Sequence, residues 1–103
     1  MTGESRERAL LVGVDTGEEV DFDRTMEELK SLAEACNMQV VGLITQKMVA
    51  VNKALYVGTG KVEEIKQFIA ECEADIVIFD NALSPSQIRN LQDELDMPIL
   101  DRT

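Results

Sequence analysis

The chain has 103 residues and a formal net charge of −10, with 20 acidic and 10 basic side chains and no histidine. Its length suits one domain with a single core, and the missing histidine excludes histidine-based acid–base catalysis and most zinc sites. The acidic balance argues against a free-standing nucleic-acid binder, whose phosphate contacts need a basic surface.

The two cysteines, Cys36 and Cys72, form no C-x-x-C motif. We expect free thiols buried on apolar helix faces in a reducing cytosol, rather than a disulfide or a metal site. No run approaches the roughly 20 apolar residues of a membrane span, and the charged residues 1–7 lack the apolar core of a signal peptide. The sequence therefore predicts a cytoplasmic protein without a membrane partner.

The first predicted strand is the continuous apolar run R-A-L-L-V-G-V at residues 8–14, which is typical of a strand buried on both faces. An acidic loop, residues 15–23, should follow it. Thr25 and Glu28 have the spacing of a capping box and predict the start of a helix. Asn37 would end this helix, whose predicted apolar face consists of Met26, Leu29, Leu32, Ala33 and Cys36.

Residues 40–45, V-V-G-L-I-T, predict a second buried strand, and an extension at residues 46–58 interrupts the regular pattern after it. Loops seldom collect apolar residues, yet this one contains Met48, Val49 and Val51. Two interpretations remain open and are compatible. The segment forms a short hairpin that turns at Asn52-Lys53, or it exposes a contact surface for another chain.

The second helix should begin near Gly60 or Lys61, with Glu63 and Glu64 in its first turn, where they complement the helix dipole. Its predicted apolar face consists of Val62, Ile65, Phe68, Ile69 and Cys72. A third buried strand, I-V-I-F, follows at residues 76–79.

The third helix has a strong start signal, with Ser84 as N-cap, Pro85 at the first helical position and Gln87 three residues after the cap. Its predicted buried face consists of Ile88, Leu91 and Leu95. Met97-Pro98 should end the helix, and residues 99–100 begin a fourth strand.

The element order is therefore β-α-β-(extension)-α-β-α-β. This alternation predicts an α/β fold of three layers, in which a four-stranded parallel sheet of order 2-1-3-4 carries helices on both faces. The fourth strand is barely complete at Thr103. We therefore expect residues 1–103 to be a single α/β domain cut from a longer protein.

The segment Gly58-Thr59-Gly60-Lys61 resembles part of a P-loop, but Leu55 stands where the first glycine is needed and Val62 replaces the serine or threonine. We reject a P-loop. Gly58 and Gly60 supply backbone freedom for a turn into the helix, or they form an anion site with Lys61 at the helix N-terminus. These two interpretations are also compatible.

The charge pattern around this segment favours phosphate contacts. No acidic residue occurs between Glu34 and Glu63, and Lys47, Lys53 and Lys61 fall in that window. If any part of the chain contacts RNA phosphate or a nucleotide, this is the expected place.

A second candidate site lies at the carboxyl ends of the strands, where open parallel sheets bind ligands. Asp15 and Asp80 are expected side by side there, which suggests a phospho-acceptor or magnesium pocket. The alternative is that acids simply end strands and begin loops. The full set at this edge is Asp15, Gln46, Lys47, Asp80, Asn81 and Asp101.

No nucleophile–base pair is present, because Ser84 and Ser86 are explained by helix capping and no general base accompanies them. We therefore predict no catalytic residue, no metal ligand and no enzymatic activity for this chain alone. Arg89 and Asn90 lie early on the third helix, on its polar side, and are either solvated or contact a partner.

Several motifs in fixed order resemble the N-terminal domain of the HflX family of GTPases. The combination is specific, although no single motif is. The matching segments are R-A-L-L-V-G-V at 8–14, M-E-E-L-K-S-L-A-E at 26–34, V-V-G-L-I-T-Q-K at 40–47, Y-V-G-T-G-K-V-E-E-I at 56–65, A-D-I-V-I-F-D at 74–80, L-S-P-S-Q-I-R-N-L at 83–91 and D-R-T at 101–103.

The resemblance implies a domain that precedes a helical segment and a Ras-like GTP-binding domain, in a factor that acts on the large ribosomal subunit during splitting or rescue under stress. GTP and magnesium would belong to the full-length protein, and ATP binding by this region is an alternative. The implied partners are ribosomal RNA and the protein's own GTPase domain. The candidate ligand or RNA-phosphate residues are Lys47, Lys53, Tyr56, Gly58, Gly60 and Lys61.

The sequence departs from the family pattern at residues 48–51, which are wholly apolar and lack the charged residues and proline often found there. Three hypotheses therefore stand: a ribosome-contacting accessory domain, a nucleotide-binding domain, and an interaction module that forms a homodimer through Met48, Val49 and Val51.

Overall fold

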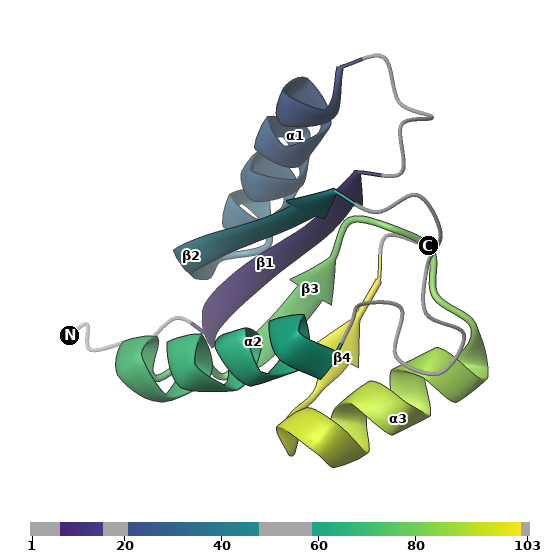
Figure 1. Ribbon diagram of the computed structural model, residues 1–103. Helices are drawn as coiled ribbons and strands as arrows, with labels where there is room; N and C mark the ends of the chain where they lie inside the picture. The colour runs from purple at the N-terminus through teal and green to yellow at the C-terminus, as the bar shows by residue number, and fades with distance from the viewer. Residues whose placement is uncertain (1–6, 16–20, 48–58, 102–103) are drawn as a thin grey trace, which may run out of the picture.

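The computed structural model describes residues 7–15, 21–47 and 59–101, which form a parallel sheet between two layers of helices (Figure 1). The strands are β1 (Glu7–Asp15), β2 (Met38–Lys47), β3 (Ile76–Phe79) and β4 (Ile99–Leu100). The helices are α1 (Phe22–Ala35), α2 (Thr59–Cys72) and α3 (Pro85–Leu95). The strands are ordered β2-β1-β3-β4 and pair in parallel, which confirms the predicted α/β architecture and strand order.

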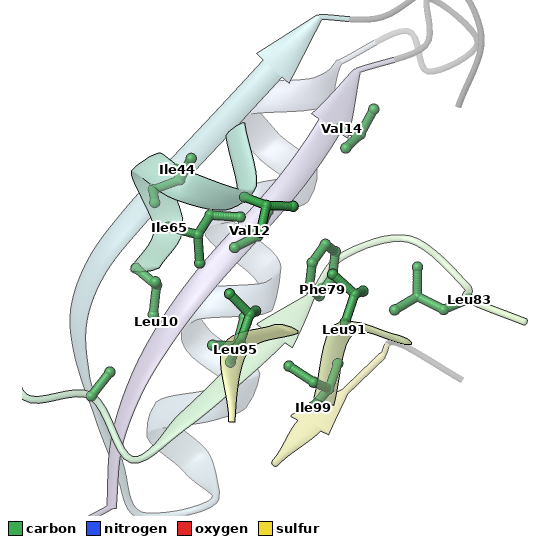
Figure 2. Packing of buried hydrophobic residues seen from close by; sticks show 13 residues of the cluster. Leu10, Val12, Val14, Ile44, Ile65, Phe79, Leu83, Leu91, Leu95 and Ile99 are labelled. Carbon is green, nitrogen blue, oxygen red and sulfur yellow. The ribbon is translucent and has the colours of Figure 1, made fainter. Parts of the chain in front are cut away.

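The two faces of the sheet are covered unequally. Figure 1 shows α1 alone on one face and α2 and α3 together on the other. The larger core lies under α2 and α3, where Leu10, Val12 and Phe79 from the sheet meet side chains such as Ile65 and Leu91 from the helices (Figure 2). The smaller core lies under α1.

Strand β1 forms the centre of the molecule, because it pairs with β2 on one side and β3 on the other. Its side chains alternate between the two cores. Leu10 and Val12 point toward α2 and α3, and Ala9 and Leu11 point toward α1. All four are at most 1% exposed, so the apolar run of the sequence is explained by burial on both faces.

Strand β2 does not have the burial that its sequence predicted. It is longer than expected, since Gln46 and Lys47 still belong to it, and Ile44 is its one buried residue. Leu43 is 51% exposed. The reason is the sheet order, because β2 pairs with β1 and with no other described strand.

Helix α1 begins one turn earlier than the predicted capping box. Asp21 is the N-cap, and its carboxylate accepts a hydrogen bond from the backbone N–H of Arg24 at 3.2 Å. The hydroxyl of Thr25 donates to the backbone oxygen of Asp21 at 3.1 Å, so Thr25 lies inside the helix. The prediction of a Thr25–Glu28 box was wrong, because aspartate is as good an N-cap as threonine and occurs four residues earlier.

The predicted apolar face of α1 is only partly correct. Met26, Leu29 and Ala33 are buried, whereas Leu32 is 54% exposed and Cys36 is exposed. Cys36 is the C-cap residue and lies beyond the last helical turn, which explains why its thiol is not buried as expected. Both cysteines are free, and Cys72 is half-buried.

Helix α2 begins at Thr59, so Glu63 and Glu64 lie beyond its first turn and the predicted dipole interaction was wrong. Instead, Glu64 pairs with Lys61 at 3.2 Å and Glu63 pairs with Lys66 at 3.3 Å. No helix in the described ranges is long and apolar enough to cross a membrane.

The start of α3 is as predicted. The backbone N–H of Gln87 donates to the Ser84 hydroxyl at 3.2 Å, and the backbone N–H of Ser84 donates to the Gln87 side chain at 2.9 Å. Pro85 occupies the first helical position. These contacts orient α3 so that Leu91 and Leu95 are buried against the sheet.

Candidate functional site

The carboxyl edge of the sheet collects the polar residues that the sequence placed there. Asp15 is the last residue of β1, Lys47 is the last residue of β2, Asp80 follows β3 and Asp101 follows β4. Their positions in the fold are as expected. The printed contacts of Asp101 and of the neighbouring Asn81 are with the backbone of the chain itself.

Asn81 fills the place between β1 and β3 where a ligand would enter a sheet of this type. Its side-chain oxygen accepts a hydrogen bond from the backbone N–H of Val14 at 3.0 Å. Its amide nitrogen donates to the backbone oxygen of Val14 at 3.1 Å. The Asn81 side chain therefore pairs with β1 as another strand residue would, and its polar atoms are already engaged.

Asp80 and Asp15 are not opposite one another in the pairing of β1 with β3. Asp80 follows Phe79, the register partner of Val12, and its backbone N–H donates to the Val12 oxygen at 2.9 Å. Asp15 lies three residues beyond Val12 and is half-buried, whereas Asp80 is only 4% exposed. The two aspartates are therefore offset by two residues in the register and not directly opposite, because β3 ends before it reaches the level of Asp15.

Asp101 stabilises the connection that leads into α3. Its carboxylate accepts a hydrogen bond from the backbone N–H of Leu83 at 2.9 Å, which joins the end of β4 to the loop before the helix. In the described part of the chain, no group of three or more cysteine or acidic residues could hold a metal ion. The edge thus offers little support for a magnesium pocket.

The end of β2 differs from the other strand ends. Lys47 is exposed and lies opposite Asp15 in the strand register. Gln46 is half-buried, and its Oε1 atom is buried without a hydrogen-bond partner within the described ranges. A buried hydrogen-bond acceptor without a donor is uncommon in folded proteins, and this distinguishes the end of β2 from the other strand ends.

The start of α2 places Gly60 and Lys61 on the helix itself. Gly60 is exposed, its φ is not positive, and a Cβ there would meet no atom within 4 Å. The interpretation of Gly60 as a turn residue was therefore wrong, because helical backbone suits any residue at this position. The Lys61 ammonium donates to the Glu64 carboxylate at 3.2 Å, and its side chain is 15% exposed.

The remaining candidates divide between α3 and a segment that the structure does not describe. Arg89 is exposed on α3, and Asn90 is half-buried beside it. The other candidates lie outside the described residues: Met48, Val49, Val51, Lys53, Tyr56 and Gly58.

Sequence reasoning missed two features. Arg8 joins β1 to the end of α2, since its Nε donates to the backbone oxygen of Cys72 at 3.1 Å. A groove between α1 and β2 was also missed, because β2 was expected to be buried on both faces. An arginine at the start of an apolar strand was the available signal for the first. The signal for the second was the predicted order 2-1-3-4, which places residues 40–45 in an edge strand.

Comparison with known proteins identifies the family. A family model described as "GTP-binding GTPase N-terminal" matches residues 23–103. The chain is 44% identical over 98 residues to GTPase HflX of Caldanaerobacter subterraneus subsp. tengcongensis, which covers 95% of this chain and 22% of that protein. It is 33% identical over 97 residues to GTPase HflX of Escherichia coli (strain K12), covering 94% of this chain and 22% of that protein.

A solved structure shares the fold. The crystal structure of SsGBP in complex with GDP matches with a TM-score of 0.69 at 23% sequence identity, over 92% of this chain and 26% of the other. The chain spans about a fifth of the length of the two HflX proteins. The chain belongs to the GTP-binding GTPase N-terminal family, and it corresponds to the N-terminal domain of HflX-type GTPases.

Proposed function

We propose that this chain is an accessory domain that contacts the large ribosomal subunit, in a GTPase whose nucleotide chemistry belongs to a separate domain. GTP and magnesium would be bound by that domain. The contact would be made to ribosomal RNA phosphate, and it would place the protein in the cytoplasm. The domain itself would catalyse no reaction.

The observation that carries the proposal is a stretch of sequence without acidic residues that includes the end of β2 and the start of α2. The chain has a net charge of −10, yet no acidic residue occurs between Glu34 and Glu63. The exposed Lys47 ends β2 within that window, and Lys61 lies in the first turn of α2. Lysine ammonium groups and the positive ends of helix dipoles both attract the negative charge of phosphate.

The test is a titration of the chain against isolated large ribosomal subunits at several salt concentrations. Lys47→Glu should weaken binding and lower the slope of log K against log salt by about one, because one phosphate contact is lost. Lys61→Glu should act in the same direction. Lys30→Glu is the matched control, since Lys30 is exposed on α1, outside the acid-free window, and its replacement changes the net charge equally.

If Lys30→Glu weakens binding as much as Lys47→Glu does, the contact is a response to net charge and the proposed surface is wrong. Unchanged binding in a Lys47→Glu, Lys61→Glu double variant would exclude this surface altogether.

A nucleotide site in this chain is the weaker alternative. The crevice between β1 and β3 is the usual ligand position in such sheets, and Asn81 already occupies it with two hydrogen bonds to Val14. Binding of ATP to the native state would raise the melting temperature. No shift at millimolar ATP would remove this alternative.

A further inference from the structure

Two exposed leucines lie on the α1 face of the sheet, both on the β4 side of that helix. Leu100 of β4 is 45% exposed, and its register partner Ile78 belongs to the core under α1. Leu32 of α1 is 54% exposed. Lys30 and Glu34 line the groove between α1 and β2. Because successive helical residues are rotated by about 100°, Leu32 lies on the opposite side of α1, toward β3 and β4.

The uncovered part of this face has the width of one helix. Helix α1 lies over β1, since a Cβ on Gly13 of that strand would lie 2.8 Å from Cζ of Phe22 and 2.9 Å from Cε of Met26. Neighbouring strands are about 4.8 Å apart, so β4 lies about 10 Å from β1, across β3. The axes of two packed helices are about 8–10 Å apart. A second helix in contact with α1 on this side would therefore lie over β4.

The opposite face of β4 has no such space. Ile99 is 4% exposed and belongs to the larger core, together with Leu91 and Leu95 of α3. A segment that follows β4 therefore finds uncovered apolar surface only on the α1 face of that strand. Burial of such surface is the dominant favourable term in packing.

We propose that, in the full-length protein, the helix that follows β4 packs beside α1 and covers Leu32 and Leu100. The family model describes the matched region as N-terminal, and the region accounts for 22% of each of the two HflX relatives, so most of their polypeptide lies outside it. Each of the strands β1, β2 and β3 is followed by a helix. The inference rests on the chain being part of a longer polypeptide, and it is independent of the proposed RNA contact.

Two physical reasons favour this occupant over a separate molecule. A segment joined to the end of β4 by a short connection is present at an effective concentration in the millimolar range, so a small apolar patch is enough to hold it. A second copy of the chain would instead bring another net charge of −10 to an acidic surface, which opposes association.

The test measures the labelling rate of cysteines introduced by Leu32→Cys, Leu100→Cys and Leu43→Cys, with a maleimide reagent and peptide mass spectrometry. Leu43 is the matched control, because it is 51% exposed on the same face at the β2 end of the sheet. All three sites should react at similar rates in the 103-residue chain. In the full-length protein, labelling at positions 32 and 100 should slow by about tenfold or more, since it then requires local opening, and position 43 should be unchanged.

A chain extended by roughly 25 residues of its natural continuation should already give the same protection, because a helix of that length spans the sheet. Protection in the full-length protein that this extended chain lacks would assign the cover to a more distant domain and overturn the proposal. Equal labelling of the three sites in the full-length protein, or equal protection of position 43, would also overturn it. Protection that is lost on dilution would identify a second copy instead. No ribosomal subunit is present in the assay, so its outcome does not depend on the RNA contact.

Discussion

Replacing Asn81 with alanine tests whether the best-placed residue of the candidate pocket is structural. The side chain makes two hydrogen bonds to the backbone of Val14, at 3.0 Å and 3.1 Å, and both are partly buried. Each hydrogen bond makes a net contribution of about 1 kcal/mol to the free energy of unfolding. Leaving a buried backbone group without a hydrogen-bond partner costs about 1–3 kcal/mol. Because water can reach part of this site, we expect Asn81→Ala to lower the free energy of unfolding by about 2 kcal/mol.

Urea denaturation followed by far-UV circular dichroism measures this loss, and the melting temperature should fall by roughly 10 °C in a domain of this size. Gln92→Ala is the control, since it removes an exposed side-chain amide from α3 and should change stability by less than about 0.5 kcal/mol. If Asn81→Ala unfolds at the same urea concentration as the unmodified chain, the two bonds do not stabilise the fold. The side chain would then be free to serve a ligand.

Asn81→Asp separates the two bonds, because a carboxylate can still accept from the Val14 N–H but cannot donate to the Val14 oxygen. We expect it to destabilise the chain at neutral pH. The protonated carboxyl can donate, so the folded-state pKa of the introduced group should be raised. Its deficit relative to the unmodified chain should therefore shrink as the pH falls, and a deficit that grows instead would contradict the assignment.

Three further results follow from the packing and ion pairs. Gly42→Ala should destabilise the chain by about 1–3 kcal/mol, since a Cβ there would lie 2.7 Å from Cζ of Phe68 and collide with its ring; an unchanged urea midpoint would mean that the ring moves aside freely. Ser84→Ala should cost about 1 kcal/mol through loss of the α3 cap, again measured in urea. The hydrogen bond that the Lys66 ammonium donates to Glu63 raises the pKa of Lys66 above its usual 10.5. The stabilisation of the fold by this pair is therefore full below pH 10.5 and is lost as the pH rises through the higher folded-state pKa. Glu63→Gln should lower the Lys66 pKa, as followed by NMR titration of its Cε signal.

Much of the fold could be predicted because its signals are local. The apolar run of β1, the short strand β3 and the Ser84 cap each specify one element from neighbouring residues. The alternation of strands and helices then restricts the sheet to right-handed parallel connections, and the observed order β2-β1-β3-β4 is the one expected for the first part of a doubly wound fold.

The misplaced starts of α1 and α2 are local errors, whereas other errors concern properties that depend on the assembled sheet. Val40 to Ile44 has the composition of a buried strand, but its exposure is decided by which strands lie beside it. Leu43 is consequently half exposed, although its register partner Leu11 is fully buried. The same limit applies to Asp15 and Asp80, because the lengths of β1 and β3 decide whether the two carboxylates meet.

At the carboxyl edge of the sheet, some polar side chains are hydrogen-bonded to the backbone and others are exposed to solvent. After β3 and β4, the Asn81 side chain is hydrogen-bonded to Val14 and the Asp101 carboxylate to the backbone N–H of Leu83, so these polar groups hold the loops in place. At the end of β2, Lys47 is exposed and the Gln46 oxygen lacks a hydrogen-bond partner in the described ranges. The exposed Lys47 is therefore available for the phosphate contact that we propose. In the proposed function the phosphate contact therefore lies at the end of β2 and not between β1 and β3, where the Asn81 side chain is already hydrogen-bonded to Val14.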